Sequence, residues 1–216
     1  NIHGNTSITL NGTTNGLQAV YSKNRTTNIG GYINESNELV ADGNVTITLE
    51  PQTAGTSYST YNCGVAAYAG TVNILGNTNI TATGEYVTAG VVSRGSGTTN
   101  ISGGTITADN ACIFSDSQTT LNISDNAVLN APDCGIKYDG NSNSNVINIS
   151  GGTFNVTGEN AYAISSVNAA NKAKITISGG TFNLTGANAT ALSLNGADTA
   201  NITGGTFSST GANTTS

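Results

Sequence analysis

The chain has 216 residues, of which only 8% are charged, and its formal net charge is −6. Its six Lys and Arg residues are too few for the basic surface that nucleic-acid binding requires, which excludes nucleic acid as a partner. No apolar run is long enough for a membrane-spanning helix. Asn, Thr and Gly dominate while helix-forming residues are scarce, so the composition favours short β-strands joined by turns.

The N-terminal part of the chain, 1–69, follows the pattern of the rest only loosely. Residues 6–10 and 45–49 predict first strands of early coils, and residues 17–21 predict a third strand, because apolar and polar residues alternate there. Residues 22–44 and 51–62 are longer, polar stretches that predict loops or a decorated coil. Two interpretations of them stay open: a recognition surface, or repeats that have drifted.

Residues 70–216 repeat one phrase. Asn-Ile-Ser-Gly-Gly-Thr-Phe starts at Asn148 and returns in close form at Thr176 and Asn201. The first Gly of the pair, or its counterpart, recurs at uneven steps, at Gly76, Gly103, Asp125, Gly151, Gly179 and Gly204. A repeat of this size without helical patterning indicates a solenoid, and we predict one domain over residues 1–216.

Each repeat divides into three short strands, which predicts an all-β fold, a parallel β-helix with about 22–28 residues per coil. We expect a right-handed coil, with the Gly pair at the corner between the first and second strands. The predicted inward columns are Ile101, Ile123, Ile149, Ile177 and Ile202 in the first strand, and Ile106, Val128, Phe154, Phe182 and Phe207 in the second. In the third they are Cys63, Val65, Ala67, Val87, Ala89, Val91, Ala111, Ile113, Ser115, Cys134, Ile136, Tyr138, Ala161, Ala163, Ser165, Ala189, Ala191 and Ser193.

The Asn-Ile-Ser-Gly-Gly-Thr-Phe phrase with its Ala-rich third strand resembles the pectin-lyase-like right-handed β-helix, and more closely the surface adhesins and fibres of bacteria. The resemblance covers residues 70–216 well and residues 1–69 weakly. It implies an extracellular protein, but that fold carries lyases, hydrolases and adhesins alike. The enzymes of the fold imply a cluster of carboxylates on one outer face, with Lys or Arg as the base of a lyase.

The best candidate for such an enzyme site surrounds Lys137. We expect its side chain to point outward, with Asp133 and Asp139 nearby and Asp116 about one coil back. A solvated group of surface charges explains the same residues, and no repeat column stacks two carboxylates convincingly. We expect Tyr162 and Ile164 beside Lys137 in the next coil, where they add no charge.

Other chemistry finds little support in the sequence. His3 is the only histidine and lies near the start of the chain, so a Ser-His-Asp triad is not expected. Asp139, Asn141 and Asn143 offer alternating oxygen ligands, but the loop lacks the Gly and Glu of a calcium site. We expect no cofactor. Asn-x-Ser/Thr matches follow from composition.

The three cysteines fit no zinc spacing. Burial as small apolar residues is the preferred interpretation of Cys63, Cys112 and Cys134, and a disulfide between Cys112 and Cys134 is the alternative.

Outward positions of the second strand form the most distinctive predicted surface, a flat ladder of hydroxyl and amide groups. Its members are Thr105, Thr107, Thr153, Asn155, Thr157, Thr181, Asn183, Thr185, Thr206 and Ser208. Such a face could bind glycans or ice, or pack against a sister molecule; the alternative is that Thr simply favours strands. The uneven repeat argues against ice binding.

No capping helix is evident at either end, and the last coil contains only two strands. Open strand edges invite end-to-end stacking or belong to a longer stalk. We therefore expect a non-enzymatic, extracellular structural or adhesive element of the cell surface, whose partners are further copies of itself or glycans. The alternatives are a polysaccharide-active enzyme centred on Lys137, and a glycan- or ice-binding module that uses the ladder.

Overall fold

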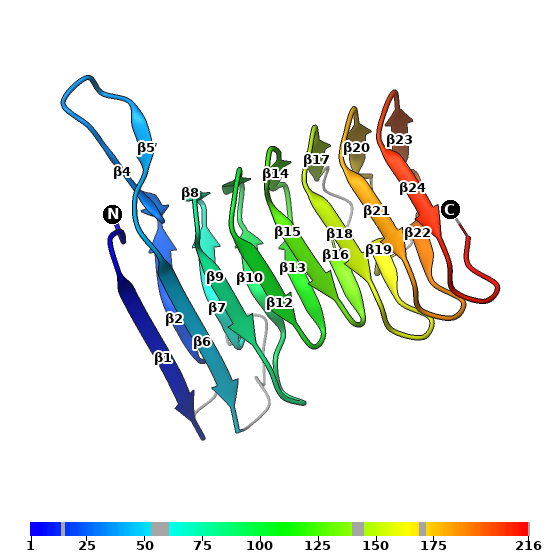
Figure 1. Cartoon of the computed structure of the whole chain (residues 1–216), viewed down its shortest axis with the longest axis horizontal. Helices are drawn as coiled ribbons and strands as arrows, with labels where there is room; N and C mark the ends of the chain where they lie inside the picture. The colour runs from blue at the N-terminus through cyan, green and yellow to red at the C-terminus, as the bar shows by residue number, and fades with distance from the viewer. Residues whose placement is uncertain (14–15, 53–60, 140–144, 169–171, 216) are drawn as a thin grey trace.

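The structure is a computed structural model that describes residues 1–13, 16–52, 61–139, 145–168 and 172–215. These residues form 24 strands and no helix, so nothing in them resembles a membrane-spanning helix. Three parallel sheets run along a solenoid, and the N- and C-termini lie toward its opposite ends (Figure 1). The all-β solenoid predicted from the repeat is confirmed, whereas its handedness stays a prediction.

Sheet A holds the first strand of each repeat. Its members are β3 (Thr26–Ile29), β8 (Thr71–Ile74), β11 (Thr98–Ile101), β14 (Thr120–Ile123), β17 (Val146–Ile149), β20 (Lys174–Ile177) and β23 (Thr199–Ile202). Ile74, Ile101, Ile123, Ile149, Ile177 and Ile202 align in successive strands, which confirms the uneven coil length that the repeat predicted.

Sheet B holds the second strands, after the Gly-Gly corner. It consists of β1 (Thr6–Gly12), β6 (Val45–Pro51), β9 (Asn79–Ala82), β12 (Thr105–Ala108), β15 (Val128–Ala131), β18 (Thr153–Val156), β21 (Thr181–Leu184) and β24 (Thr206–Ser209). The predicted role of the glycine pair is confirmed at the corners, because Gly152 and Gly180 have φ of 85° and 95°. Such angles are open to glycine and strained for other residues.

Sheet C holds the third strand of each repeat. A separate antiparallel hairpin projects from the N-terminal coils (Figure 1). The strands of sheet C are β2 (Gln18–Lys23), β7 (Cys63–Tyr68), β10 (Ala89–Arg94), β13 (Ala111–Asp116), β16 (Cys134–Asp139), β19 (Tyr162–Ser166) and β22 (Thr190–Ser193). The hairpin pairs β4 (Gly31–Ile33) with β5 (Leu39–Ala41).

The described part of the N-terminal region, 1–69, joins the same three sheets. The strands predicted at residues 6–10 and 45–49 exist as β1 and β6, but they lie in sheet B, so their assignment as first strands is wrong. The first strand of that region is β3, inside the stretch predicted as loop. β3 is as long as the other strands of sheet A, but the β4–β5 hairpin follows it at once, so the rest of the repeat phrase is missing there.

One inward position of sheet B is corrected. Val128 was predicted in the core, but it pairs with the outward Thr105 and Thr153, and Leu129 fills the core position instead. The corner between Ile123 and Leu129 carries one residue more than the Gly-Gly corners. Because strand side chains alternate, that single extra residue places each side chain of β15 on the face opposite to the one predicted.

Sheet C corrects a second set of inward positions, because two successive residues of each strand face the core. A Cβ on Gly64 would lie 2.7 Å from Ile80 across the core, and the next residue, Val65, is also in the main core. Cys63, Ala89, Ala111 and Cys134 therefore belong to a separate apolar cluster on the outer side of the sheet. The predictions for Ser165 and Ser193 are also wrong, since Ile164 and Leu192 take the inward places.

Aligned side chains stabilise the coil both inside and outside. In the core, Phe154, Phe182 and Phe207 stack with ring centroids 4.6 Å apart at each step. On the outer side of sheet A, asparagine side-chain amides donate to one another through consecutive coils at 2.7–2.9 Å, along Asn1, Asn28, Asn73, Asn100, Asn122 and Asn148. Each of these hydrogen bonds satisfies a buried or half-buried amide that would otherwise lose hydrogen bonds to water.

The cysteines are free and buried, as their preferred interpretation predicted. Cys112 faces the core while Cys134 lies in the outer cluster of sheet C, and Cys134 pairs with Ala111 rather than with Cys112. The alternative disulfide is therefore not formed.

Burial controls the chemistry of these thiols. It raises the pKa of Cys134 to about 12 and raises the pKa of Cys63 and Cys112 further. We expect thiol reagents to leave the folded protein unmodified at pH 8 and to label three cysteines in urea, as mass spectrometry would record. Because unfolded thiols ionise first, stability should fall as the pH rises from about 9 toward 12. Rapid labelling of the native protein would contradict the buried placement.

Candidate functional site

The predicted ladder lies on the outer surface of sheet B. Thr153, Asn155 and Thr181 are half-buried outward residues, and Asn183 donates to Asn155, which donates to Asn130, at 2.9–3.0 Å. Thr157 and Thr185 are exposed just beyond the strands. The remaining ladder residues occupy the outward positions of neighbouring strands, at Thr105, Thr107, Thr206 and Ser208. The amides are thus occupied by one another, which limits the hydrogen bonds left for a ligand.

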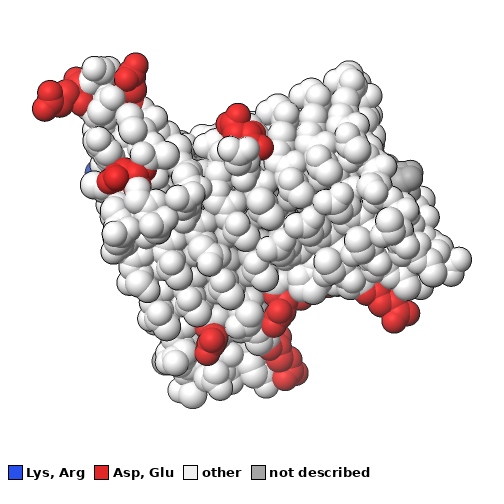
Figure 2. Space-filling model, viewed as in Figure 1, with Lys and Arg blue, Asp and Glu red and all other residues white. Residues whose placement is uncertain are grey.

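Figure 2 has the same view as Figure 1, in which the strands of sheet B lie toward the viewer. This face is almost entirely uncharged, and the Asp and Glu side chains gather at its borders. An uncharged, flat face can pack against another surface, but the described strands of sheet B present no cation, carboxylate pair or aromatic ring on it that would select a ligand.

The residues predicted around Lys137 are only partly brought together. Lys137 does face outward, but its Nζ donates to Asn110 Oδ1 at 3.2 Å, and its neighbour in the next coil is Ser165 rather than Tyr162 or Ile164. Asp133 is exposed at the corner preceding the strand. Asp116 and Asp139 align in adjacent strands, so the expectation that no column stacks two carboxylates is corrected.

Asp116 is tied to groups that the sequence did not suggest. Its Oδ2 lies 3.1 Å from Arg94 Nε and accepts a 3.3 Å hydrogen bond from the Tyr61 hydroxyl. Asp139 follows in the same column, and its Oδ1 is buried without a hydrogen-bond partner. Arg94, Asp116 and Asp139 therefore form a charged column along the outer face of sheet C.

The calcium-like loop is not tested, because Asn141 and Asn143 lie outside the described residues. Within the described ranges, no group of three or more His, Cys, Asp or Glu side chains could hold a metal ion. His3 contacts Asp42 at 2.7 Å, and both side chains are well exposed.

The site that sequence reasoning missed is a cleft on the outer face of sheet C, with a volume of about 320 Å³. Its polar and aromatic lining consists of Gln18, Tyr21, Lys23, Tyr61, Tyr68 and Arg94, which we call the tyrosine cleft. Ala66 and Val92 form part of its apolar lining. No nearby residues in the sequence indicate this cleft, since its members come from three strands and from the segment that precedes β7.

Aromatic and cationic groups are interleaved within the tyrosine cleft. The Arg94 guanidinium carbon lies 4.9 Å from the Tyr61 ring centroid and 5.8 Å from that of Tyr68, and Lys23 Nζ lies 5.4 Å from the Tyr68 centroid. Behind them, the Tyr61 ring packs against Phe114 with centroids 5.3 Å apart. Cation–π contacts and the Arg94–Asp116 ion pair hold these side chains in place.

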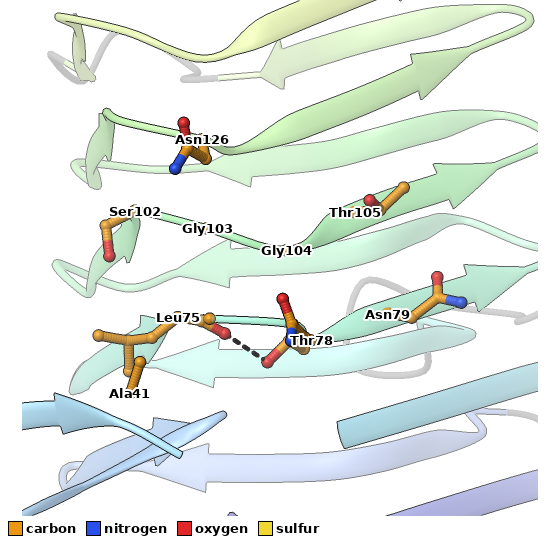
Figure 3. A pocket seen from close by; sticks show the side chains of 11 residues that line it. Ala41, Leu75, Thr78, Asn79, Ser102, Gly103, Gly104, Thr105 and Asn126 are labelled. Atoms are coloured by element: carbon orange, nitrogen blue, oxygen red, sulfur yellow. Dashed lines mark hydrogen bonds between the residues drawn. The ribbon is translucent and has the colours of Figure 1, made fainter. Parts of the chain in front are cut away.

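A second hollow, of about 620 Å³, lies over the corners between sheets A and B (Figure 3). Gly103 and Gly104 contribute only backbone to it, and the Thr78 hydroxyl donates to the Leu75 carbonyl at 2.8 Å. None of the described residues that line it has a charged or aromatic side chain. The hollow therefore follows from the narrow glycine corners and offers less chemistry than the tyrosine cleft.

Comparisons of this chain with protein-family models, with curated proteins and with solved structures find no match. The fold and the arrangement of side chains therefore carry the functional argument alone.

Proposed function

We propose that this protein is a non-enzymatic structural and adhesive element of a cell surface, secreted and assembled as a rod of stacked coils. The all-β solenoid is compatible with such a role, since it is a rigid, extended scaffold that repeats along one axis. The observation that carries the proposal is the state of its C-terminal coil. There the inward columns are left open to solvent.

The open coil is evident in the isoleucine column of sheet A. Ile202 in β23 is 50% exposed, whereas Ile177 and Ile149, its equivalents in the two preceding coils, are 0% and 1% exposed. Every residue of β23 is exposed, and Phe207 in β24 is only half-buried. An apolar end with unpaired strand edges is stabilised when another coil covers it.

The N-terminal coil has the complementary pattern. Ile8 in β1 occupies the same inward column as Phe207, through the successive pairings of sheet B, and is itself only half-buried. All strands of the three sheets are parallel, so a second copy placed head to tail would set β1 beside β24 in the same direction. Such a heterologous contact does not close on itself and produces a filament. Further coils of a longer chain would cover the same end.

The test is the association state of this chain in solution. We expect sedimentation and negative-stain microscopy to detect rods that lengthen with concentration, because the isolated chain presents the open coil in either case. Ile202→Asp places a charge in the inward column and should return the protein to monomers, while Ser208→Asp, on the outer side of the same coil, should leave the rods intact.

Two results would contradict the proposal. One is a wild-type protein that remains monomeric at all concentrations. The other is rod formation that Ser208→Asp abolishes and Ile202→Asp does not, which would indicate lateral packing of the uncharged face of sheet B.

A polysaccharide-active enzyme is the second candidate, and one specific observation favours it. Asp116 and Asp139 align in adjacent strands beside Arg94, and paired carboxylates are the usual catalytic groups of glycoside hydrolysis. If this candidate is correct, the protein cleaves a polysaccharide from a broad panel, and Asp139→Asn abolishes the cleavage without altering the fold. Absence of cleavage across the panel supports the structural role.

A further inference from the structure

We propose that the tyrosine cleft binds a single acidic sugar unit, carrying a carboxylate or a sulfate, at the end of a glycan. This inference does not depend on rod formation, because the cleft lies on the outer face of sheet C within the N-terminal coils and not at the open C-terminal coil.

The aromatic rings define the first part of the ligand. Tyr21 is 55% exposed and Tyr68 is 36% exposed. Both rings are open to solvent, whereas Ala66, which pairs with Tyr21 on the same face, is buried. A pyranose ring has one apolar face of C–H groups and a rim of hydroxyls, which suits an exposed tyrosine ring beside polar side chains. Gln18 supplies an amide at the same cleft, able to donate to and accept from hydroxyls.

The charges define the second part. The chain has a net charge of −6, yet two of its six basic residues, Lys23 and Arg94, line this one cleft. Arg94 is ion-paired with Asp116, whereas Lys23 forms no ion pair among the described residues and is exposed. An anionic group on the ligand would thus meet the Lys23 ammonium, in a charge-assisted contact.

The size of the cleft limits the ligand to a short one. A volume of about 320 Å³ is at the lower end of the range for small-molecule sites, so the cleft holds one acidic terminal unit and little of the glycan behind it. The rigid, prearranged walls described above reduce the ordering that binding requires. Recognition of a glycan end is also the chemistry that an adhesive surface protein would use.

Calorimetric titration with matched sugars tests the inference. Sialyllactose and sulfated lactose each carry an acidic group that lactose lacks. We expect at least one of the two to bind, and lactose to bind at least about tenfold more weakly than that sugar. The one that binds identifies carboxylate or sulfate as the acidic group. Binding should weaken as salt concentration rises, since the cleft is partly exposed.

Substitutions locate the binding. Tyr21→Ala and Lys23→Gln should each reduce the affinity about tenfold or more. Tyr86→Ala and Lys174→Gln provide matched controls, because Tyr86 is 37% exposed and Lys174 is also exposed, yet neither lines the cleft. Thermal unfolding of each variant confirms that the fold is retained.

Three outcomes would overturn the inference: no binding of either acidic sugar, equal binding of lactose, or binding that the control substitutions reduce as much as the cleft substitutions do. The Ile202→Asp variant should keep full affinity. Failure of rod formation and failure of glycan binding are therefore separate results.

Discussion

Replacing Phe182 by alanine is expected to lower the free energy of unfolding by about 3–5 kcal/mol. Phe182 is completely buried and lies between Phe154 and Phe207, with ring centroids 4.6 Å from each. The substitution removes a ring from the middle of the stack and leaves a cavity. Neighbouring coils cannot close over it, because the parallel strands on both sides fix their spacing.

Urea denaturation followed by circular dichroism would measure this loss. Thr181→Ala is the matched control, since Thr181 precedes Phe182 in β21 but faces outward and is half-buried, and we expect it to change stability by less than about 1 kcal/mol. Phe207→Ala should cost less than Phe182→Ala, because Phe207 is partly open to solvent at the last coil. Equal losses at Phe182 and Thr181 would contradict the assignment of the inward column.

The inward column of sheet A was predictable because two simple rules determine it. Alternation along each strand selects the face, and the repeat length places Ile101, Ile123 and Ile149 at equivalent positions in successive coils. Both rules are local or periodic, so they can be applied without knowledge of distant contacts. The same reasoning failed at Val128, where the corner is one residue longer and the alternation restarts on the other face.

The tyrosine cleft could not be predicted in this way. Tyr61 comes from a stretch that the sequence indicated as loop, and it reaches Asp116, 55 residues later, only because β7 and β13 are two coils apart in the same sheet. The outward column that joins Tyr68, Arg94 and Asp116 depends on the register of sheet C, where two successive inward residues interrupt the alternation. Because this column contains a tyrosine, an arginine and an aspartate in turn, the sequence has no repeated residue type that would reveal the column.

The uncharged ladder of sheet B and the tyrosine cleft thus occupy different faces with different chemistry. The ladder repeats because each Asn or Thr meets a similar residue in the next coil, and this regularity satisfies its amides internally. The cleft departs from the repeat, and its aromatic and charged residues are not needed for coil formation elsewhere. Residues that depart from a structural repeat are the better candidates for recognition.

Replacing Gly186 by alanine is expected to destabilise the protein by about 2–3 kcal/mol, through crowding rather than through loss of contacts. Gly186 follows β21 at the corner between sheets B and C, and an added Cβ would collide with the backbone carbonyl oxygen of Gly158 in the preceding coil. The carbonyl cannot turn away freely, because the coils are joined there by the hydrogen bond from the Thr185 amide to the Val156 carbonyl. Gly12→Ala is the matched control at the end of β1. Among the described residues its Cβ would meet only the Leu17 side chain, at 3.8 Å, and stability should change by less than about 1 kcal/mol. Urea titrations of both variants would measure the difference, and a Gly186→Ala protein as stable as Gly12→Ala would mean that the coils can separate at this corner. The expected contrast follows from the fold itself, since a solenoid built from narrow turns requires a residue without a side chain wherever one backbone lies directly on the next.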